Sequence, residues 1–378
     1  MAQTERPSLW IKLLHQPSAL IGGSIALAAL VLAILGYWIS PDCSPDANRM
    51  IIEISSKKPG FTQQFLLLPK SPRPVIRSWW SRTLYGQPDQ FTYLPIRSFQ
   101  LEKDSIRFQQ FIDEGLYEQK VLPLAALTEP RDPANGSFNS GEPIASNRAL
   151  PFIKQERYLL GTDKFGRDIL SRLIIGTRIS LMVGGIAMAL SLTIGLLLGT
   201  IAGYYGGKYD LVIMWFINVI WSIPTLLLVF AITLLLGKGF WQVFIAVGLT
   251  MWVNVARLVR GQLIAARNLE YVEAARALGY RDWRIMVKHI LPNIMGPVLV
   301  VAAANFASAI VVEAGLSFLG VGVQPPQPSW GGMIKENYNF IITNNPMLAL
   351  APGFAIMLLV LAFNLIGNGI RDALDVRS

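Results

Sequence analysis

The sequence is short of charged residues, cysteine and histidine. Only 15% of its 378 residues are charged and 52% are hydrophobic, so the chain is far more apolar than a soluble domain. The single cysteine, Cys43, excludes an internal disulfide, and His15 and His289 have no neighbours at the spacing of metal ligands. We therefore predict a membrane protein with no metal site and no cofactor of its own.

The phosphate-binding loop of ATPases is missing as well. No G-x-x-x-x-G-K-[ST] pattern occurs, because Gly207-Lys208 and Gly237-Lys238 lack both the upstream glycine and the following hydroxyl residue. We therefore expect no ATP hydrolysis by this chain. The net charge of +9 does not indicate a nucleic-acid partner, because the basic residues are not gathered into one soluble patch with interleaved aromatics.

Long apolar runs are what the sequence has in abundance. The run at 19–39 is about 20 residues long, enough for a bilayer core of about 30 Å. A cleaved signal peptide is the alternative, but the run is long for one and no small-residue cleavage site follows it. Five further spans are expected at 179–203, 211–236, 240–256, 294–319 and 348–370. The fold class is then an all-α polytopic membrane protein with six transmembrane helices, the third of them kinked at Pro224.

The segment 40–159 has a different composition. It is rich in proline and charge but also holds eleven large aromatic residues between 61 and 117, too many for a disordered linker. Residues 99–101 and 106–108 alternate on either side of 102–105, which predicts a hairpin, and Asn135-Gly136 lies in a loop-like stretch. We expect a small insert domain of β or mixed character, with a partly ordered spacer as the alternative.

The polar segment 257–292 fixes the expected topology. It holds seven basic and three acidic residues, a net charge of +4, and such an excess marks the cytoplasmic side of a membrane. The termini, 1–18 and 371–378, are then cytoplasmic, and the insert lies outside.

Within that segment the pattern predicts a short helix, a bend and a second helix. Tyr271, Ala274, Ala275 and Leu278 fall at i, i+3, i+4 and i+7 and would share one face. Gly279 follows the last of them, where a left-handed residue ends a helix most cheaply. Asp282 is expected to cap a second helix over 283–291, and Pro292 to end it. Two adjacent alanines would let a partner approach closely. An ordinary surface helix-turn-helix is the alternative.

These residues resemble a known motif. Glu273-Ala274-Ala275, then Gly279, then Leu291-Pro292 is similar to the EAA loop of bacterial ABC-importer permeases, which seats in a groove of the ATPase subunit. The family usually has a hydrophobic residue two positions before the Leu-Pro pair. Here that residue is His289, as in the dipeptide and oligopeptide branch. The resemblance implies these ATPase-coupling residues: Tyr271, Glu273, Ala274, Ala275, Leu278, Gly279, His289, Leu291 and Pro292.

Two other stretches carry the same resemblance. One runs from Leu160-Gly161-Thr162-Asp163 through Gly166-Arg167-Asp168, and the other is the proline-rich loop 320–331. From the residues alone, Thr162 or Asp163 would cap a helix and Asp168 would pair with Arg172. The resemblance covers 160–375, the expected permease core, although relatives have a shorter segment in place of the insert.

The resemblance implies the permease subunit of an ABC importer of the dipeptide, oligopeptide and nickel class in a bacterial inner membrane. Its implied partners are a second homologous permease, two ATP-binding subunits that hold ATP and Mg, and an extracytoplasmic solute-binding protein. One alternative is a secondary transporter or channel that uses Glu313, an acid well inside a span. We expect Glu313 to serve packing or gating instead. Another alternative is a membrane anchor for the insert.

Overall fold

The computed structural model describes Leu13 and residues 15–102, 104–127, 152–237, 239–342 and 345–374. The chain divides into two compact units. We call residues up to Ala33, Gly176–Lys335 and those from Pro352 onward the helical unit. Ile34–Ile175 and Glu336–Ala351 form the sheet unit. Asn135-Gly136, the segment 1–12 and the last four residues lie outside the described residues.

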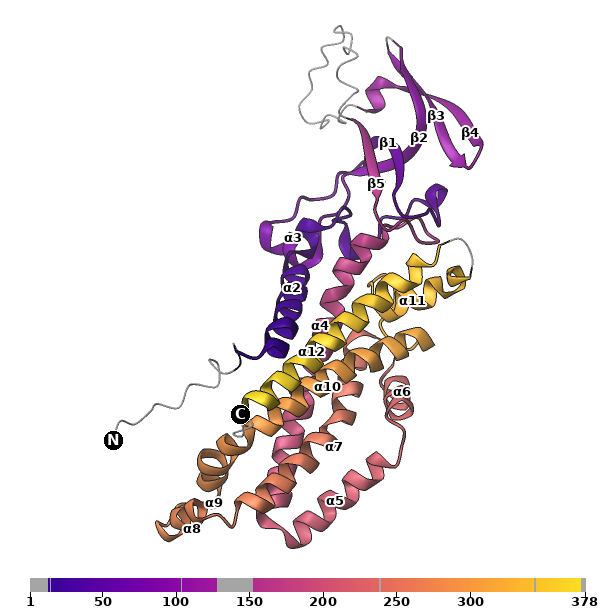
Figure 1. Cartoon of the computed structure of the whole chain (residues 1–378). Coiled ribbons are helices and arrows are strands. Elements are labelled where there is room, and N and C mark those ends of the chain that lie inside the picture. Colours follow the sequence, from indigo (N-terminus) through magenta and orange to yellow (C-terminus); the bar gives the residue numbers. More distant parts are fainter. Residues whose placement is uncertain are drawn as a thin grey trace, which may run out of the picture. The chain divides into compact units, whose positions relative to one another are not determined.

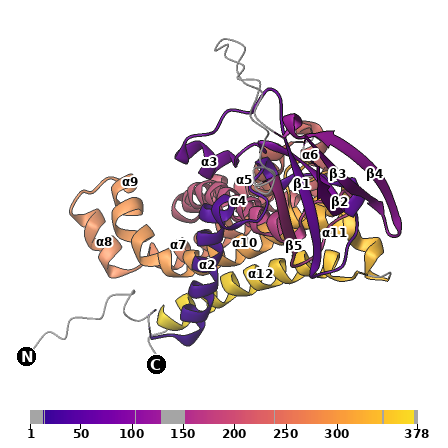
Figure 2. The ribbon, with the colours of Figure 1, turned by 90° about the horizontal axis from the view of Figure 1, so that it is seen from above.

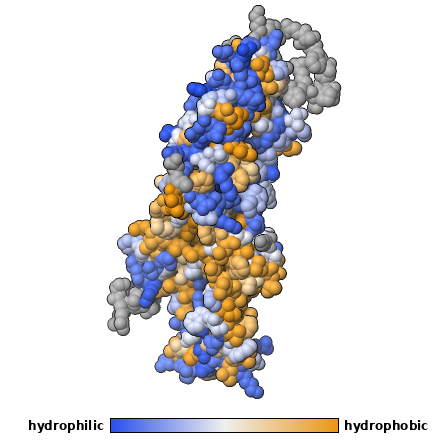
Figure 3. Space-filling model, turned by 90° about the vertical axis from the view of Figure 1, so that its right-hand side faces the viewer, coloured by the Kyte–Doolittle hydropathy of each residue, from blue (hydrophilic) through white to orange (hydrophobic). Residues whose placement is uncertain are grey.

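Five helices in the described part of the chain are long and apolar enough to cross a membrane. The space-filling view shows broad hydrophobic areas on the face that it presents (Figure 3). α10 is preceded without interruption by helical turns from Asp282, and the whole run extends from Asp282 to Leu319. The five are α2 (Pro17–Ile39), α4 (Ile169–Tyr205), α7 (Phe240–Ala266), α10 (Leu291–Leu319) and α12 (Met347–Leu374).

The expected span 211–236 is a broken helix. α5 (Gly207–Trp221) and α6 (Thr225–Leu236) meet at an angle of 92° across Ser222–Pro224. Proline cannot donate a backbone hydrogen bond and disfavours helical backbone in the residue before it, so the break falls where the kink was expected. The described residues hold five membrane helices, or six if this bent pair counts as one span.

Three glycines of α4 let it approach α7 closely. Gly195, Gly199 and Gly203 recur every four residues on one face of α4. A Cβ at Gly199 would lie 2.6 Å from the Ala256 carbonyl oxygen, and one at Gly203 would lie 2.7 Å from Leu263 Cβ. Small residues at such spacing are typical of tightly packed membrane helices.

The sheet unit contains a five-stranded antiparallel sheet in the order β4-β3-β2-β1-β5 (Figure 1). The predicted hairpin is confirmed, since Phe99 pairs with Phe108 and Leu101 with Ile106. Phe61 at the start of β1 pairs with Tyr158 at the end of β5, so the chain enters and leaves the sheet at neighbouring points. The strands are β1 (Phe61–Pro69), β2 (Phe91–Leu101), β3 (Ser105–Asp113), β4 (Leu116–Pro123) and β5 (Ile153–Tyr158).

Shorter helices complete the two units. α3 (Trp79–Tyr85) lies between β1 and β2 in the sequence, and α8 (Glu270–Ala277) and α9 (Asp282–Arg284) follow α7. α11 (Trp330–Asn337) precedes α12. Side chains from both faces of the sheet are buried, Leu66 and Phe108 in one apolar cluster and Phe65 and Phe111 in another. The prediction of a mostly helical chain with a sheet-containing insert is confirmed.

Candidate coupling site

The segment between α7 and α10 begins later than the charge pattern indicates. Residues 257–266 are the last turns of α7. Arg260 forms an ion pair with Asp210 of α5, and the Arg257 guanidinium lies 3.5 Å from the ring centroid of Trp221. These two basic residues therefore attach α5 to α7.

α8 ends as predicted. Gly279 has φ of +76°, a left-handed conformation that glycine adopts without strain. The Tyr280 N–H donates to the Ala275 carbonyl at 3.1 Å and the Gly279 N–H donates to the Arg276 carbonyl at 2.9 Å. This is the Schellman pattern, which satisfies two carbonyls that a helix end otherwise leaves open.

The four residues expected to share one face of α8 divide between two faces. Tyr271 and Leu278 are 37% and 72% exposed, and Ala274 is exposed beside them, while Glu273 is exposed on another side of the helix. Ala275 is only 4% exposed and packs with Val272 in the core of the helical unit. The expectation of a single outward face is corrected at Ala275, because Val272 and Ala275, at i and i+3, form the side that α8 buries.

The second helix differs from the prediction at both ends. Asp282 is the first residue of α9, with Arg281 before it as the capping position. Pro292 does not end the helix. A π-helix, Ile285–Ile290, follows α9 and runs directly into α10, so Pro292 stands in the first turn of α10, where its missing N–H is tolerated.

The remaining predicted coupling residues contact their own chain. The His289 ring stacks on Tyr280, with centroids 5.6 Å apart and planes inclined by 17°. Leu291 packs against the apolar core, whereas Pro292 is exposed. The Tyr204 hydroxyl donates to the Asp282 carboxylate at 2.7 Å, which ties α9 to the end of α4.

One apolar cluster joins these elements. It contains Leu263 of α7, Val272 and Ala275 of α8, Met286 of the π-helix and Ile294 of α10. In Figures 1 and 2, α8 and α9 stand beyond the ends of α7 and α10, at the edge of the helical unit. Because packed apolar clusters resist deformation, a displacement of α8 would move α7 and α10 with it.

Glu313 lies in α10 and is 1% exposed. The Ser317 hydroxyl donates to its carboxylate at 2.6 Å and in turn accepts from the Val323 N–H at 3.1 Å. Through Ser317, Glu313 is therefore connected to the chain that leaves α10.

A polar cavity that the sequence analysis did not predict lies beside the α5–α6 break. It has a volume of about 200 Å³ and is lined at the break by Trp221 and Thr225. Asn305 of α10 is buried there and donates to the Ser191 hydroxyl and to the Met251 carbonyl, each at 3.3 Å. Polar side chains of α7 and α10 that line the cavity are Thr250, Asn254, Asn305 and Ser308. Their signal in the sequence is four polar residues within otherwise apolar runs.

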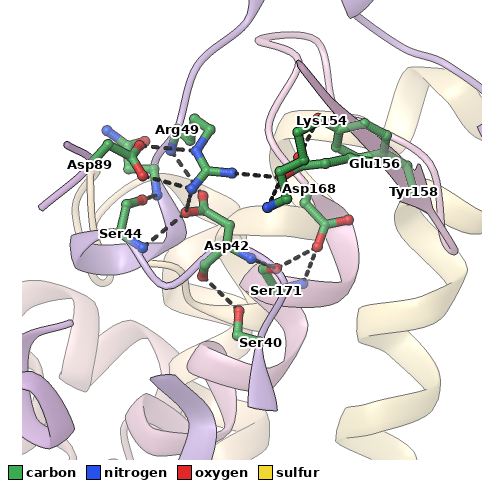
Figure 4. Close-up of polar contacts among 11 residues, drawn as sticks. Ser40, Asp42, Ser44, Arg49, Asp89, Lys154, Glu156, Tyr158, Asp168 and Ser171 are labelled. Carbon is green, nitrogen blue, oxygen red and sulfur yellow. Dashed lines mark hydrogen bonds and ion pairs between the residues drawn. The ribbon is translucent and has the colours of Figure 1, made fainter. Parts of the chain in front are cut away.

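The sheet unit has a polar centre around Arg49 (Figure 4). The Arg49 guanidinium makes two hydrogen bonds to Asp89, at 2.6 and 2.9 Å, and lies 3.5 Å from Asp42 and 3.6 Å from Glu156. It also lies 3.9 Å from the ring centroid of Tyr93. A cavity of about 150 Å³ adjoins the cluster. One cation therefore holds together the segment after α2, the start of β2 and strand β5.

The pKa values of Arg49, Tyr93 and Asp168 are all shifted from their usual values. Burial lowers the pKa of Arg49, but the hydrogen bond to Asp89 and the charge of Asp42 more than reverse this, so the pKa is raised overall. Burial raises the pKa of Tyr93 to about 12, although the charge of Arg49 opposes the shift. Burial also raises the pKa of Asp168, against the hydrogen bonds from Ser171.

The start of α4 is organised differently from the prediction. Asp168 is the capping residue and accepts hydrogen bonds from the Ser171 N–H and hydroxyl. The pair at i and i+4 is Asp163 and Arg167, 2.6 Å apart, with Arg167 also 2.6 Å from Glu336. Arg172 does not take the expected place beside Asp168. It lies 3.8 Å from Glu336 and 3.9 Å from Asp163.

Comparisons with known proteins decide the family. Residues 195–378 match the model of the binding-protein-dependent transport system inner membrane component. The glutathione transport system permease protein of Pectobacterium atrosepticum is 43% identical over 216 residues, which are 57% of this chain and 71% of the relative. The chain belongs to this family of transport permeases. The alternative of a non-transporting membrane anchor is thereby set aside.

Other relatives in this permease family agree. The dipeptide transport system permease protein of Alkalihalophilus pseudofirmus is 44% identical, over 57% of this chain and 70% of the relative. The oligopeptide transport system permease protein of Bacillus subtilis is 41% identical, with the same shares covered. A solved structure of the methionine ABC transporter, in an inward-facing conformation, is 19% identical with a TM-score of 0.45, covering 54% of this chain and 97% of that chain.

Proposed function

We propose that this permease forms half of the membrane path of an ABC importer for peptides or a related small solute. The family membership supports a permease role, and the relatives are named for dipeptides, oligopeptides and glutathione. A second homologous permease would complete the path, two ATP-binding subunits would drive it, and a solute-binding protein would deliver the solute. The bent pair α5–α6 then counts as the sixth span. Both termini face the cytoplasm of a bacterial inner membrane, and the sheet unit faces outward.

The exposed stripe of α8 is the proposed contact with an ATP-binding subunit. Tyr271, Ala274 and Leu278 face away from the core that Val272 and Ala275 enter. A small alanine between two larger apolar side chains forms a shallow contact surface for a partner, and the charge of Glu273, exposed on another side of the same helix, can fix the register of the contact. α8 therefore has one face buried in the core and another face exposed. The proposed coupling role rests on this observation.

The apolar cluster behind α8 supports a lever mechanism. Closure of the ATP-binding subunits on nucleotide would displace α8, and the shared core would pass this displacement to α7 and α10 as one body. Nucleotide supplies the energy, because it favours one conformation of the ATP-binding subunits over the other. The permease itself needs only a rigid connection between α8 and the membrane helices α7 and α10.

A matched pair of tryptophan substitutions tests the coupling role. Ala274 and Ala277 are both exposed on α8, but only Ala274 lies in the stripe with Tyr271 and Leu278. We expect Ala274→Trp to reduce co-purification of the ATP-binding subunits and solute-stimulated ATP hydrolysis, and Ala277→Trp to reduce them much less. Normal amounts of both variants in the membrane are the control. Full coupling in Ala274→Trp would show that α8 is only a connector.

The polar cavity beside the α5–α6 break is the proposed lining of the solute path. Asn254 and Ser308 are exposed along it and offer hydrogen-bond partners at membrane depth, where a peptide would otherwise lose its hydration. We expect Asn254→Leu to slow uptake while ATP-binding subunits still co-purify. Thr193→Val, on α4 and not among the cavity-lining residues, is the control. Unchanged uptake by Asn254→Leu would remove this cavity from the path.

Glu313 provides the test against a secondary transporter. In the structure its carboxylate holds Ser317 and, through it, the Val323 N–H. We expect uptake by Glu313→Gln in proteoliposomes of the complete complex to require ATP and to continue when the proton gradient is collapsed. Uptake that follows the gradient and ignores ATP would favour the secondary transporter instead.

A further inference from the structure

α3 and the residues just before it form an apolar and aromatic surface in the sheet unit. The side chains of Val75, Ile76, Trp80 and Leu84 are 84%, 77%, 71% and 56% exposed, and Tyr85 is 63% exposed. The only buried side chain of α3 is that of Thr83. Large apolar groups collected on one short segment are uncommon on a surface that faces only water.

This segment is fastened to the last turn of α2. The Trp38 indole N–H donates to the Thr83 hydroxyl at 3.0 Å, and the rings of Trp38 and Trp79 lie 6.2 Å apart. The Arg82 guanidinium lies 4.0 Å from the centroid of the Trp38 ring. α2 has 23 residues, about 35 Å at 1.5 Å per residue, so Trp38 near its end lies at the membrane surface. The surface around α3 is therefore held at the same level.

The charge of the segment fits a membrane surface. Residues 70–88 contain Lys70, Arg73, Arg77 and Arg82 and no acidic residue. Tryptophan and tyrosine concentrate at the headgroup level of membranes, and basic residues there are attracted to lipid phosphates. Apolar, aromatic and basic groups thus occur together at the end of a membrane helix.

We propose that α3, with the preceding residues 75–78, is an interfacial helix embedded in the lipid headgroup region of the leaflet at the Trp38 end of α2. Trp80 and Leu84, at i and i+4, share the face that enters the lipid. The helix thereby fixes the sheet unit to the membrane surface beside α2. The contact does not depend on which solute the permease transports.

Spin-label accessibility tests the proposal. The full-length permease, with Cys43→Ser to remove the only cysteine, receives one cysteine at Trp80 or Leu84 and a nitroxide label. It is reconstituted into vesicles of phosphatidylethanolamine and phosphatidylglycerol. Oxygen, which concentrates in lipid, and a water-soluble nickel chelate are the two relaxing agents. Val121 on β4, 53% exposed, is the matched control in the sheet.

We expect the ratio of oxygen to nickel accessibility to be several-fold higher at positions 80 and 84 than at position 121. A ratio equal to that at position 121 would show that α3 faces water and would overturn the proposal. Low accessibility to both agents would also overturn it, because that result indicates a protein partner over α3.

A second measurement needs no substitution. The unmodified permease in the same vesicles is labelled with a lipid that carries a photoactivatable diazirine near its headgroup. We expect the peptide that contains 75–85 to be labelled, and peptides of β3 and β4 to remain unlabelled. Labelling of those strands but not of α3 would contradict the proposal even if the cysteine variants fail to fold.

Discussion

The coupling segment and the sheet unit are stabilised in opposite ways. α8, the π-helix and the ends of α7 and α10 share one apolar cluster, and the family model covers all of them. The sheet unit has a charged centre, in which Arg49 meets Asp42, Asp89 and Glu156, and these four residues lie outside the matched residues 195–378. The first region is the one through which we propose that a displacement is transmitted, and the second holds distant segments of chain together.

The difference teaches which substitutions each region can accept. An apolar cluster tolerates exchanges that keep its volume, because many weak contacts share the energy. A buried ion cluster depends on every member, because the loss of one charge leaves its partners buried and unpaired. The predictions below use this contrast, beginning with the largest effect.

Arg49→Ala should destabilise the sheet unit by about 3–5 kcal/mol, because three carboxylates would lose their common cation. Arg107→Ala is the control, since its ion pair with Glu102 is nearly half exposed and contributes at most about 1 kcal/mol. Thermal unfolding and limited proteolysis of the solubilised permease measure the change. We expect the ATP-binding subunits to co-purify with both variants. Equal stability of the two variants would contradict the role given to Arg49.

Ala275→Trp should cost about 1–3 kcal/mol of stability, because the ring would overpack the cluster behind α8. Ala274→Trp, one residue earlier but exposed, should leave stability unchanged and weaken only the binding of ATP-binding subunits. Comparison of melting temperatures with co-purification separates the two effects. If both variants lose stability, the face of α8 that contains Ala274 is not exposed as described above.

Gly279→Val should cost about 1–2 kcal/mol, because a branched side chain is strained at φ of +76°. Gly279→Asn is the conservative control, since asparagine adopts the left-handed conformation more readily. ATP hydrolysis stimulated by solute is the measurement. We expect partial loss in the valine variant and near-normal coupling in the asparagine variant. The same loss of stimulated ATP hydrolysis in both variants would show that the effect does not arise from the backbone conformation of residue 279.

Excision of the sheet should have the smallest effect on coupling. A short glycine-serine linker from Gly60 to Leu159 would replace 61–158, whose ends are neighbours because Phe61 pairs with Tyr158. We expect membrane insertion and binding of the ATP-binding subunits to be unchanged, since the coupling residues lie in the other unit. Failure of this variant to assemble would make the insert a structural part of the permease.

The features that the sequence predicted correctly depend on local rules. The apolar runs located the membrane helices, the position of Gly279 after the last apolar residue located the bend, and alternation on either side of 102–105 located the hairpin. Each of these signals lies within one turn, one strand pair or one continuous apolar run, so the rest of the chain is not needed to interpret it.

The features that could not be predicted depend on distant partners. Arg49 meets Asp89 and Glu156 only after the sheet has formed, and nothing in the spacing of these residues indicates it. α8 is short and its pattern allowed Ala275 to face either way, so the tertiary contact with Val272 and the core decided its side. Proline in a membrane helix either kinks or breaks it, and the presence of Pro224 alone does not say which of the two occurs.

The π-helix Ile285–Ile290 changes how the permease responds to the loss of a residue. Each α-helical residue turns the chain by about 100°, and a π-turn accommodates one residue more than an α-turn. Deletion of one residue here would restore α geometry and leave α9 facing the same way, with Asp282 still beside Tyr204, whereas the same deletion within α10 would rotate everything before it by about 100°. The π-helix is therefore the one place between α9 and α10 where the loss of a residue would not turn α8 and α9 about the axis of the membrane helix.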